Sequence, residues 1–114
     1  MKPLLVLVTA SSPEEGAQLA RSLLEARAAS CVNLVQGVRS FYWWQGERAE
    51  AGEVLLLIKS AEEQWDALQA VIRQNHSYDC PEIVALSPER VEEGYLSWWV
   101  GELSPQGKKP SFEP

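Results

Sequence analysis

The densest group of reactive side chains lies in one segment of seven residues, His76-Ser77-Tyr78-Asp79-Cys80-Pro81-Glu82. It combines an imidazole, a phenol, a thiol and two carboxylates. Such a set could form a metal site, a Cys/His nucleophilic pair or a polar binding pocket. It could also be purely structural, because a histidine at a helix end often bonds the last backbone carbonyls and interacts well with the helix dipole.

Metal binding by this segment depends on His76, which is its best ligand for a borderline transition metal. Asp79 and Cys80 follow closely, but their spacing matches no zinc motif. We therefore predict weak binding of a divalent cation at His76, with Cu(II) the most strongly held. No cofactor is required by any motif in the sequence.

A catalytic role is the alternative hypothesis. Cys80 lies four residues after His76, but a nucleophilic pair requires a spatial geometry that sequence spacing does not supply. We predict a protein that is not an enzyme. The alternative is an enzyme that uses Cys80 or His76 in a cleft between subunits, and selective alkylation of Cys80 would favour it.

Two helices and four strands are expected to position this segment. A continuous apolar run over residues 4–9 predicts a buried central strand. Residues 12–15, Ser-Pro-Glu-Glu, predict a helix that starts with a capping box and continues to about residue 28, with its apolar face at Ala17, Ala20, Leu23 and Leu24. A second capping box over residues 60–63 precedes a helix that ends near His76, and residues 82–86 predict the fourth strand.

The longest predicted element is a hairpin over residues 31–60. A strand of about 14 residues spans about 45 Å, whereas a domain of this size is only about 30–35 Å across. The hairpin tip should therefore project from the core, and it carries Phe41, Tyr42, Trp43 and Trp44. Exposed apolar area of this size usually marks an interface. The alternative is that Gly37 divides the stretch into two ordinary strands joined by a bulge.

The alternation within the hairpin gives two further expectations. Period-two spacing places five apolar side chains on one face of the first strand: Val32, Leu34, Val38, Tyr42 and Trp44. The charged residues 47–52 are expected to form the turn before the second strand.

The order strand, helix, strand, strand, helix, strand predicts an α+β fold of the ferredoxin-like βαββαβ type, with a long hairpin between the second and third strands. A C-terminal helix is expected over residues 91–103, apolar around most of its circumference. We expect a single domain over residues 1–103 and a loosely ordered tail over residues 104–114.

Composition excludes several classes of partner. The 114 residues carry a formal net charge of −6, which argues against nucleic-acid binding. An RNA-binding module with this fold order is the least favoured hypothesis, because the basic aromatic strand motif is missing. No apolar run is long enough to predict a membrane span. Two cysteines provide no disulfide framework, and a cytoplasmic location is expected.

Five motifs resemble one protein family. In order they are Ala29-Ser30-Cys31-Val32-Asn33, Ser40-x-Tyr42-x-Trp44-x-Gly46, Leu57-Ile58-Lys59, His76-x-Tyr78-x-x-Pro81-Glu82-Ile83 and Tyr95-Leu96-x-Trp98. Over residues 4–103 the chain resembles the CutA family, the divalent-cation-tolerance proteins. The resemblance implies a homotrimer in which the long hairpins pair around a threefold axis, as in the similar PII signalling trimers. It also implies a role in tolerance of copper and other divalent cations.

The expected binding site is an inter-subunit pocket containing Tyr42, Trp44, Lys59, Tyr78 and Glu82. Lys59 lies in an apolar strand, where a lysine either extends to solvent or pairs with a carboxylate, and Glu82 is a candidate partner. We therefore expect a homotrimeric protein with a binding or regulatory role, whose partners are its own copies and divalent cations.

Two of the metal-ligand positions proposed for the family are occupied here by other residues. Metal ligands proposed in CutA proteins include a cysteine at the end of the first strand and two adjacent histidines, and here these positions are Val8 and Asn75-His76. Only His76 remains of that set. The resemblance therefore supports weak copper binding rather than a specific copper site.

Overall fold

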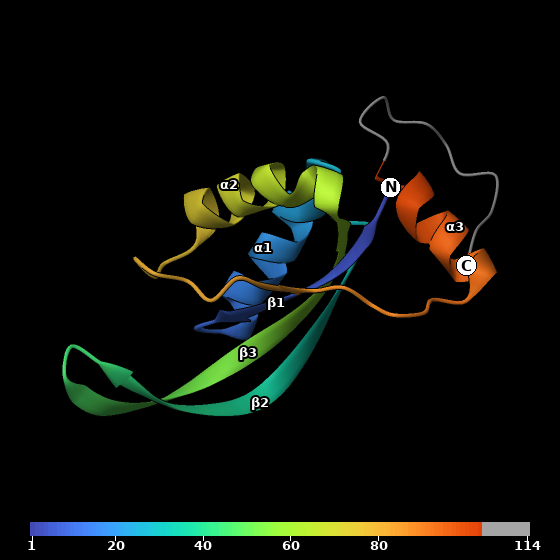
Figure 1. The fold of residues 1–114 in the computed structure, drawn as a ribbon. Coiled ribbons are helices and arrows are strands. Elements are labelled where there is room, and N and C mark those ends of the chain that lie inside the picture. Colours follow the sequence, from blue (N-terminus) through green and yellow to red (C-terminus); the bar gives the residue numbers. More distant parts are fainter. Residues whose placement is uncertain (104–114) are drawn as a thin grey trace.

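The computed structural model describes residues 1–103 (Figure 1). Its elements are, in order, β1 (Pro3–Ala10), α1 (Pro13–Glu25), β2 (Cys31–Trp44), β3 (Glu47–Ala61), a short 3-10 helix (Glu62–Gln64), α2 (Trp65–Asn75), β4 (Val84–Leu86) and α3 (Glu93–Gly101). The predicted α+β class and element order are confirmed. The expected tail over residues 104–114 lies outside the described residues.

The four strands form one antiparallel sheet in the order β2-β3-β1-β4. Helices α1 and α2 both lie on one face of it (Figure 1), which is the ferredoxin-like arrangement. Between the sheet and these helices lies the core, whose fully buried side chains include Val6, Val8, Leu56, Ile58, Leu19, Leu23, Leu68 and Ile72. Such a core fixes the sheet rigidly beneath the two helices.

The opposite face of the sheet is apolar and largely uncovered. The side chains on this face are those of alternate positions along each strand, including Leu5, Leu7, Leu55, Leu57, Val35, Val84 and Leu86. Val35, Val84 and Leu86 are 42%, 46% and 48% exposed. Helix α3 packs at one end of the sheet, where Trp99 Nε1 donates a 2.7 Å hydrogen bond to Ser60 O.

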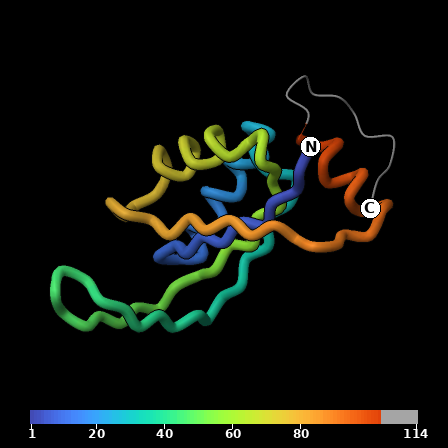
Figure 2. Tube along the Cα trace, viewed as in Figure 1, coloured from blue at the N-terminus to red at the C-terminus, as the bar shows by residue number. Residues whose placement is uncertain are grey.

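The long hairpin projects as predicted. Strands β2 and β3 stay paired from Cys31 and Lys59 out to Trp44 and Glu47, and they extend beyond the helices (Figure 2). The longest dimension of the molecule is 49 Å. The predicted turn at residues 47–52 is wrong: residues 45–46 make the turn with positive φ angles of 50° and 82°, and the charged segment is part of β3.

A bulge divides β2 into two parts whose side chains alternate in opposite phase. Val35 pairs with Leu55 and Val38 with Glu53, so three steps along β2 match two along β3. Gly37 lies in this bulge with φ of +79°. One extra residue reverses which side chains face which side.

The bulge corrects the expectation of a single apolar face on β2. Val32 and Leu34 pack against the core under the helices. Beyond the bulge, Val38, Tyr42 and Trp44 share the side of Glu53, which is the open face. The alternative of a bulge at Gly37 was therefore correct in its local geometry, although the strand continues through it.

Helix α1 begins as predicted and ends earlier. Ser12 Oγ accepts a 3.1 Å hydrogen bond from Glu15 N, which is the expected N-cap. The helix ends at Glu25, and Arg27 follows with φ of 56°. The expected apolar face is wrong in one position: the buried residues include Leu19 and Leu23, whereas Leu24 is 43% exposed.

The second predicted capping box is also wrong. Ser60 remains in β3, and its buried Oγ donates a 2.6 Å hydrogen bond to Ala28 O instead of capping a helix. Along α2, Leu68 and Ile72 are buried and Trp65 and Val71 pack partly against the core. Strand β4 is shorter than predicted, since residues 82–83 lie outside it. Among residues 1–103, no helix has the length and apolar character needed to cross a bilayer.

Candidate functional site: a cavity between the hairpin and the loop after α2

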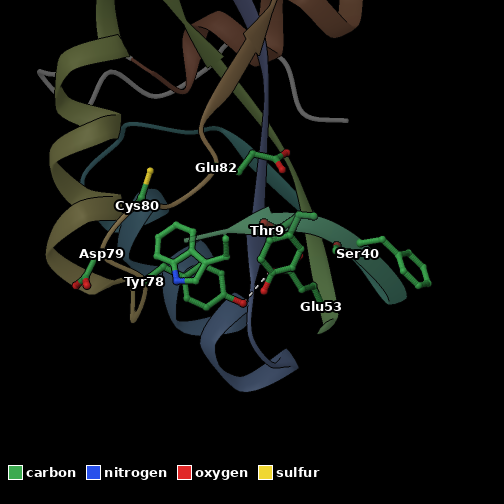
Figure 3. A pocket seen from close by; sticks show the side chains of 10 residues that line it. Thr9, Ser40, Glu53, Tyr78, Asp79, Cys80 and Glu82 are labelled. Carbon is green, nitrogen blue, oxygen red and sulfur yellow. Dashed lines mark hydrogen bonds between the residues drawn. The ribbon is translucent and has the colours of Figure 1, made fainter. Parts of the chain in front are cut away.

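A cavity of about 580 Å³ lies where the hairpin meets the loop of residues 77–82. Its lining residues come from β1, β2, β3 and this loop: Thr9, Ser40, Phe41, Tyr42, Trp44, Glu53, Tyr78, Asp79, Cys80 and Glu82. Figure 3 shows the labelled members of this set around the opening. Four aromatic rings and three carboxylates therefore surround one space.

The bulge in β2 makes this lining possible. Because it reverses the alternation, Ser40, Tyr42 and Trp44 fall on the side of Glu53. Without the extra residue, Tyr42 and Trp44 would lie on the opposite side of the hairpin from Glu53. The conformation at Gly37 therefore determines which aromatic side chains of the hairpin reach the cavity.

Tyr78 links the loop to the hairpin. Its hydroxyl donates a 2.8 Å hydrogen bond to Oε2 of Glu53, marked by the dashed line in Figure 3. Burial raises the pKa of Tyr78, and the hydrogen bond to Glu53 raises it further. The phenol therefore keeps its proton and remains a donor to the carboxylate.

Glu15 holds the start of the same loop. Its carboxylate accepts hydrogen bonds from Ser77 N at 2.7 Å and from Ser11 N at 2.8 Å. Burial acts to raise the pKa of Glu15, but the hydrogen bonds from Ser11 and Ser77 outweigh it and lower this pKa to about 2. The ionised carboxylate at the N-terminus of α1 thus anchors the loop to the helix.

The side chain of His76 is buried and makes two internal hydrogen bonds. Nε2 lies 2.7 Å from Thr9 O, and Nδ1 lies 3.1 Å from Tyr78 N. Because a carbonyl accepts and a backbone N–H donates, Nε2 carries the proton and Nδ1 accepts. Both ring nitrogens are therefore engaged, and His76 positions the loop rather than lining the cavity.

Of the five residues expected in a pocket, four lie together. Tyr42, Trp44, Tyr78 and Glu82 line the cavity. Lys59 is located elsewhere on the sheet.

The side chain of Lys59 meets polar groups of β2 instead of Glu82. Its Nζ donates to Asn33 Oδ1 and lies 3.9 Å from Cys31 Sγ. The register explains this placement, because Lys59 pairs with Cys31 on one side and Leu5 on the other. The expected partnership with Glu82 does not form within the described chain.

Sequence reasoning missed Thr9, Ser40 and Glu53 as parts of the site. Glu53 was assigned to the region just after a turn, whereas it is paired with Val38 within the hairpin. A signal was available in Gly37, because a glycine inside a strand often marks a bulge. Placing that bulge would have brought Ser40 and Glu53 to the same side.

The arrangement bears on the two chemical hypotheses. Cys80 is exposed at the cavity wall, but the nitrogens of His76 are bonded to Thr9 and Tyr78, so a Cys/His pair does not form. Among residues 1–103, no three or more His, Cys, Asp or Glu side chains are grouped as potential metal ligands. The described residues therefore do not form the Cys/His pair that the catalytic hypothesis requires.

The fold and site define an α+β protein of ferredoxin-like topology, with a projecting hairpin and an acidic, aromatic cavity between the outer part of that hairpin and the loop after α2. The chain belongs to the family described as "CutA1 divalent ion tolerance protein", which it matches over residues 4–102. The resemblance found in the five motifs is thereby confirmed.

Two bacterial relatives match most of the chain. The Divalent-cation tolerance protein CutA of Thermus thermophilus is 42% identical over 93 residues, covering 82% of this chain and 90% of the relative. That of Pectobacterium atrosepticum is 40% identical over 95 residues, covering 82% and 86%. Both names refer to tolerance of divalent cations and neither describes an enzyme.

A plant relative differs in length. Protein CutA 1, chloroplastic, of Oryza sativa is 41% identical over 95 residues, and the match covers 83% of this chain but only 54% of that protein. The crystal structure of CutA1 from Oryza sativa has a TM-score of 0.86 and 38% identity, covering 90% of this chain and 94% of that one. The described fold is therefore that of the CutA1 structures.

Proposed function

We propose that this protein is a homotrimeric, PII-like binding protein that acts in the cellular response to divalent cations, copper among them. The observation that carries the proposal is the uncovered apolar face of the sheet, continuous with the aromatic hairpin tip. Tyr42 and Trp44, which share that face, are 43% and 49% exposed, and Phe41 and Trp43 on the opposite side of the hairpin are 67% and 72% exposed. Exposed apolar area on this scale is typical of an interface.

The edge of the sheet supports the same assembly. Strand β2 is one of the two edge strands of the sheet, so about half of its backbone groups lack a partner within the sheet, along 14 residues. Pairing with the edge strand of a second copy would satisfy those backbone groups. The same assembly would also cover the apolar face of the sheet. Because β2 lies in the projecting 31–60 hairpin, we propose that this hairpin joins the three copies.

The binding site in this proposal is the cavity bounded by Tyr42, Trp44, Tyr78 and Glu82. The hairpin that lines it also carries the proposed contacts with the neighbouring subunits, so ligand and assembly could influence each other. A binding protein of this kind needs no catalytic residue and no tightly held cofactor. We also propose a cytoplasmic location, in keeping with the two free cysteines.

Copper binding at His76 belongs to the proposal as a weak interaction. Coordination through Nε2 requires loss of the bond to Thr9 O, and coordination through Nδ1 requires loss of the bond from Tyr78 N. Either loss opposes binding. Cu(II) remains the divalent ion with the best prospect, because imidazole suits it and it binds most strongly of the first-row ions.

Sedimentation equilibrium of the untagged full chain tests the assembly. One chain has a mass of 12.7 kDa, so a trimer has three times that mass, about 38 kDa. We expect the trimer at micromolar concentration with no substantial folded monomer. A mass near one chain would overturn the proposal, and native mass spectrometry of protein purified without chelators would show any retained ligand.

A further inference from the structure

We propose that the ligand of this cavity is a small organic cation, a protonated amine or a quaternary ammonium ion. The proposal rests on the proposed binding role of the cavity and specifies its ligand class. Three features of the walls support it: their aromatic rings, their charge and their volume.

The aromatic rings provide the faces that attract ammonium groups. Tyr42, Trp44 and Tyr78 line one space together with Phe41. The face of an aromatic ring is electrostatically negative, and it attracts a cation that lies within about 6 Å of the ring centroid. Several rings around one cavity form the kind of cage that recognises alkylated ammonium ions.

The charge of the walls has one sign. Glu53, Asp79 and Glu82 contribute carboxylates, and the lining includes no lysine, arginine or histidine. The nearby Arg39 pairs with Glu50 at 3.2 Å, and its guanidinium carbon lies 5.6 Å from the centroid of the Phe41 ring, so Tyr42, Trp44 and Tyr78 are the rings left for a ligand. An anionic ligand would therefore find no charge partner in these walls, whereas a cation would find several.

The Tyr78–Glu53 bond leaves the carboxylate available to a cation. Tyr78 donates to Oε2 only, so Oε1 of Glu53 can accept from the N–H of a protonated amine, and it acts as a counter-charge to a quaternary ammonium ion, which has no N–H. The raised pKa of Tyr78 means that the phenol remains protonated at neutral pH. Tyr78 is therefore uncharged, and it contributes its aromatic ring to the site rather than a phenolate.

The volume favours an organic ion over a bare metal ion. A cavity of about 580 Å³ lies within the range of about 300–1,000 Å³ seen for small-molecule sites. A divalent metal requires converging ligands at about 2.0–2.6 Å, and residues 1–103 offer no such group of three. An ion several heavy atoms in size can reach the rings and carboxylates at once.

The test compares choline with 3,3-dimethylbutan-1-ol, which has the same shape but no charge. Isothermal titration calorimetry of the full-length chain should show saturable choline binding with a Kd of about 1 mM or tighter. The uncharged compound should bind at least about tenfold more weakly, equivalent to about 1.4 kcal/mol. No choline binding, or equal binding of the two compounds, would overturn the proposal.

Variants locate the binding. Trp44→Leu and Glu53→Gln should each weaken choline binding at least about fivefold, as expected from loss of a cation–π contact or of a charge. Their controls are Trp98→Leu on α3 and Glu25→Gln on α1, whose residues do not line this cavity, and these should bind choline as the parent does. Equal losses in variants and controls would contradict the assignment.

The oligomeric mass of every variant is measured as well, so that a failure of the ligand proposal can be distinguished from a failure of the proposed trimer. A trimer that fails to bind choline would overturn the ligand class while leaving the assembly intact. A monomer that binds choline would overturn the assembly and not the ligand class. If Cu(II) instead binds the parent and is lost in Glu53→Gln, the cavity is a metal site and the organic cation is wrong.

Discussion

The hydroxyl of Tyr78 lies 2.8 Å from Oε2 of Glu53, and this hydrogen bond joins the loop after α2 to the hairpin. The two residues are 25 positions apart in the sequence. Loop and hairpin form the two sides of the cavity. The shape of the site therefore depends on a single bond between its walls, supported at the base of the loop by His76 and Glu15.

Removing this bond should destabilise the protein. Tyr78→Phe deletes the donor and leaves the carboxylate of Glu53 without it, which costs about 1–2 kcal/mol for a hydrogen bond to a charged group at a partly exposed site. Urea unfolding measures the change in free energy. Glu53→Gln is the control, because its amide oxygen still accepts from Tyr78, and it should cost less. Equal stability of parent and Tyr78→Phe would show that the bond contributes nothing.

The bulge in β2 should depend on Gly37. Its φ of +79° lies in the left-handed region, so Gly37→Ala should destabilise the hairpin by about 1–2 kcal/mol even though nothing lies within 4 Å of the added Cβ. Gly52→Ala is the matched control, because space is also open there and no positive φ is required. Thermal unfolding of both variants measures the difference. Equal effects at the two positions would mean that the left-handed conformation is not the cause.

The sequence predicts those features of the fold that depend on neighbouring residues in the chain, and it predicts less well those that depend on tertiary contacts. Element order, the cap at Ser12 and the projecting hairpin follow from local patterns, and all three are confirmed. The phase of β2 was wrong because alternation was assumed to continue through Gly37, and a bulge changes every later position. The second capping box failed because Ser60 had a stronger tertiary partner in Ala28 O.

For the candidate site, too, local motifs were predictive and strand pairing was not. Tyr42, Trp44, Tyr78 and Glu82 were identified through motifs, and the structure brings them into one cavity. Lys59 was also identified through a motif, but it does not line the cavity. The register of the sheet places its side chain beside Asn33 and Cys31. The neighbours that a side chain contacts in a sheet depend on cross-strand pairing, which a single sequence does not specify.

Stability at low pH should depend on Glu15. The folded pKa of about 2 lies below the ordinary value of 4.5, so the stabilisation is present above pH 4.5 and is lost as pH falls from there toward 2. Allowing for solvent screening, the loss should be about 1–2 kcal/mol. Urea unfolding between pH 5 and 2 measures it. Glu15→Gln should be less stable at neutral pH and less sensitive to acid across this window, and an unchanged acid response would contradict the role of Glu15.

Assembly through β2 should be sensitive to proline. Val35→Pro or Val38→Pro removes a backbone donor and disrupts the ladder on either side of the bulge. Each variant should dissociate at higher concentration than the parent. If unfolding and dissociation are coupled and reversible, the thermal midpoint of the parent should also rise with protein concentration. Two variants that stay fully trimeric and as stable as the parent would show that β2 does not pair between subunits.

Copper binding should be weak and should depend on His76. The imidazole must give up a hydrogen bond with Thr9 O or Tyr78 N before it coordinates, and Val8 and Asn75 supply no further nitrogen or sulfur ligand of the kind proposed in the family. We expect a Kd for Cu(II) of about 1 μM or weaker, with Zn(II) weaker still. Acid should release the metal, because a protonated imidazole cannot coordinate it.

Calorimetry on two variants tests this dependence. His76→Ala should lose most Cu(II) binding and also some stability, because Thr9 O and Tyr78 N lose their partner. His76→Gln retains an amide donor for Thr9 O, so it should lose the metal while remaining closer to the parent in stability. Unchanged Cu(II) binding in both would place the metal elsewhere, with the thiols of Cys31 and Cys80 the first groups to examine. Nanomolar binding by the parent would contradict a lone imidazole and would require ligands from more than one subunit.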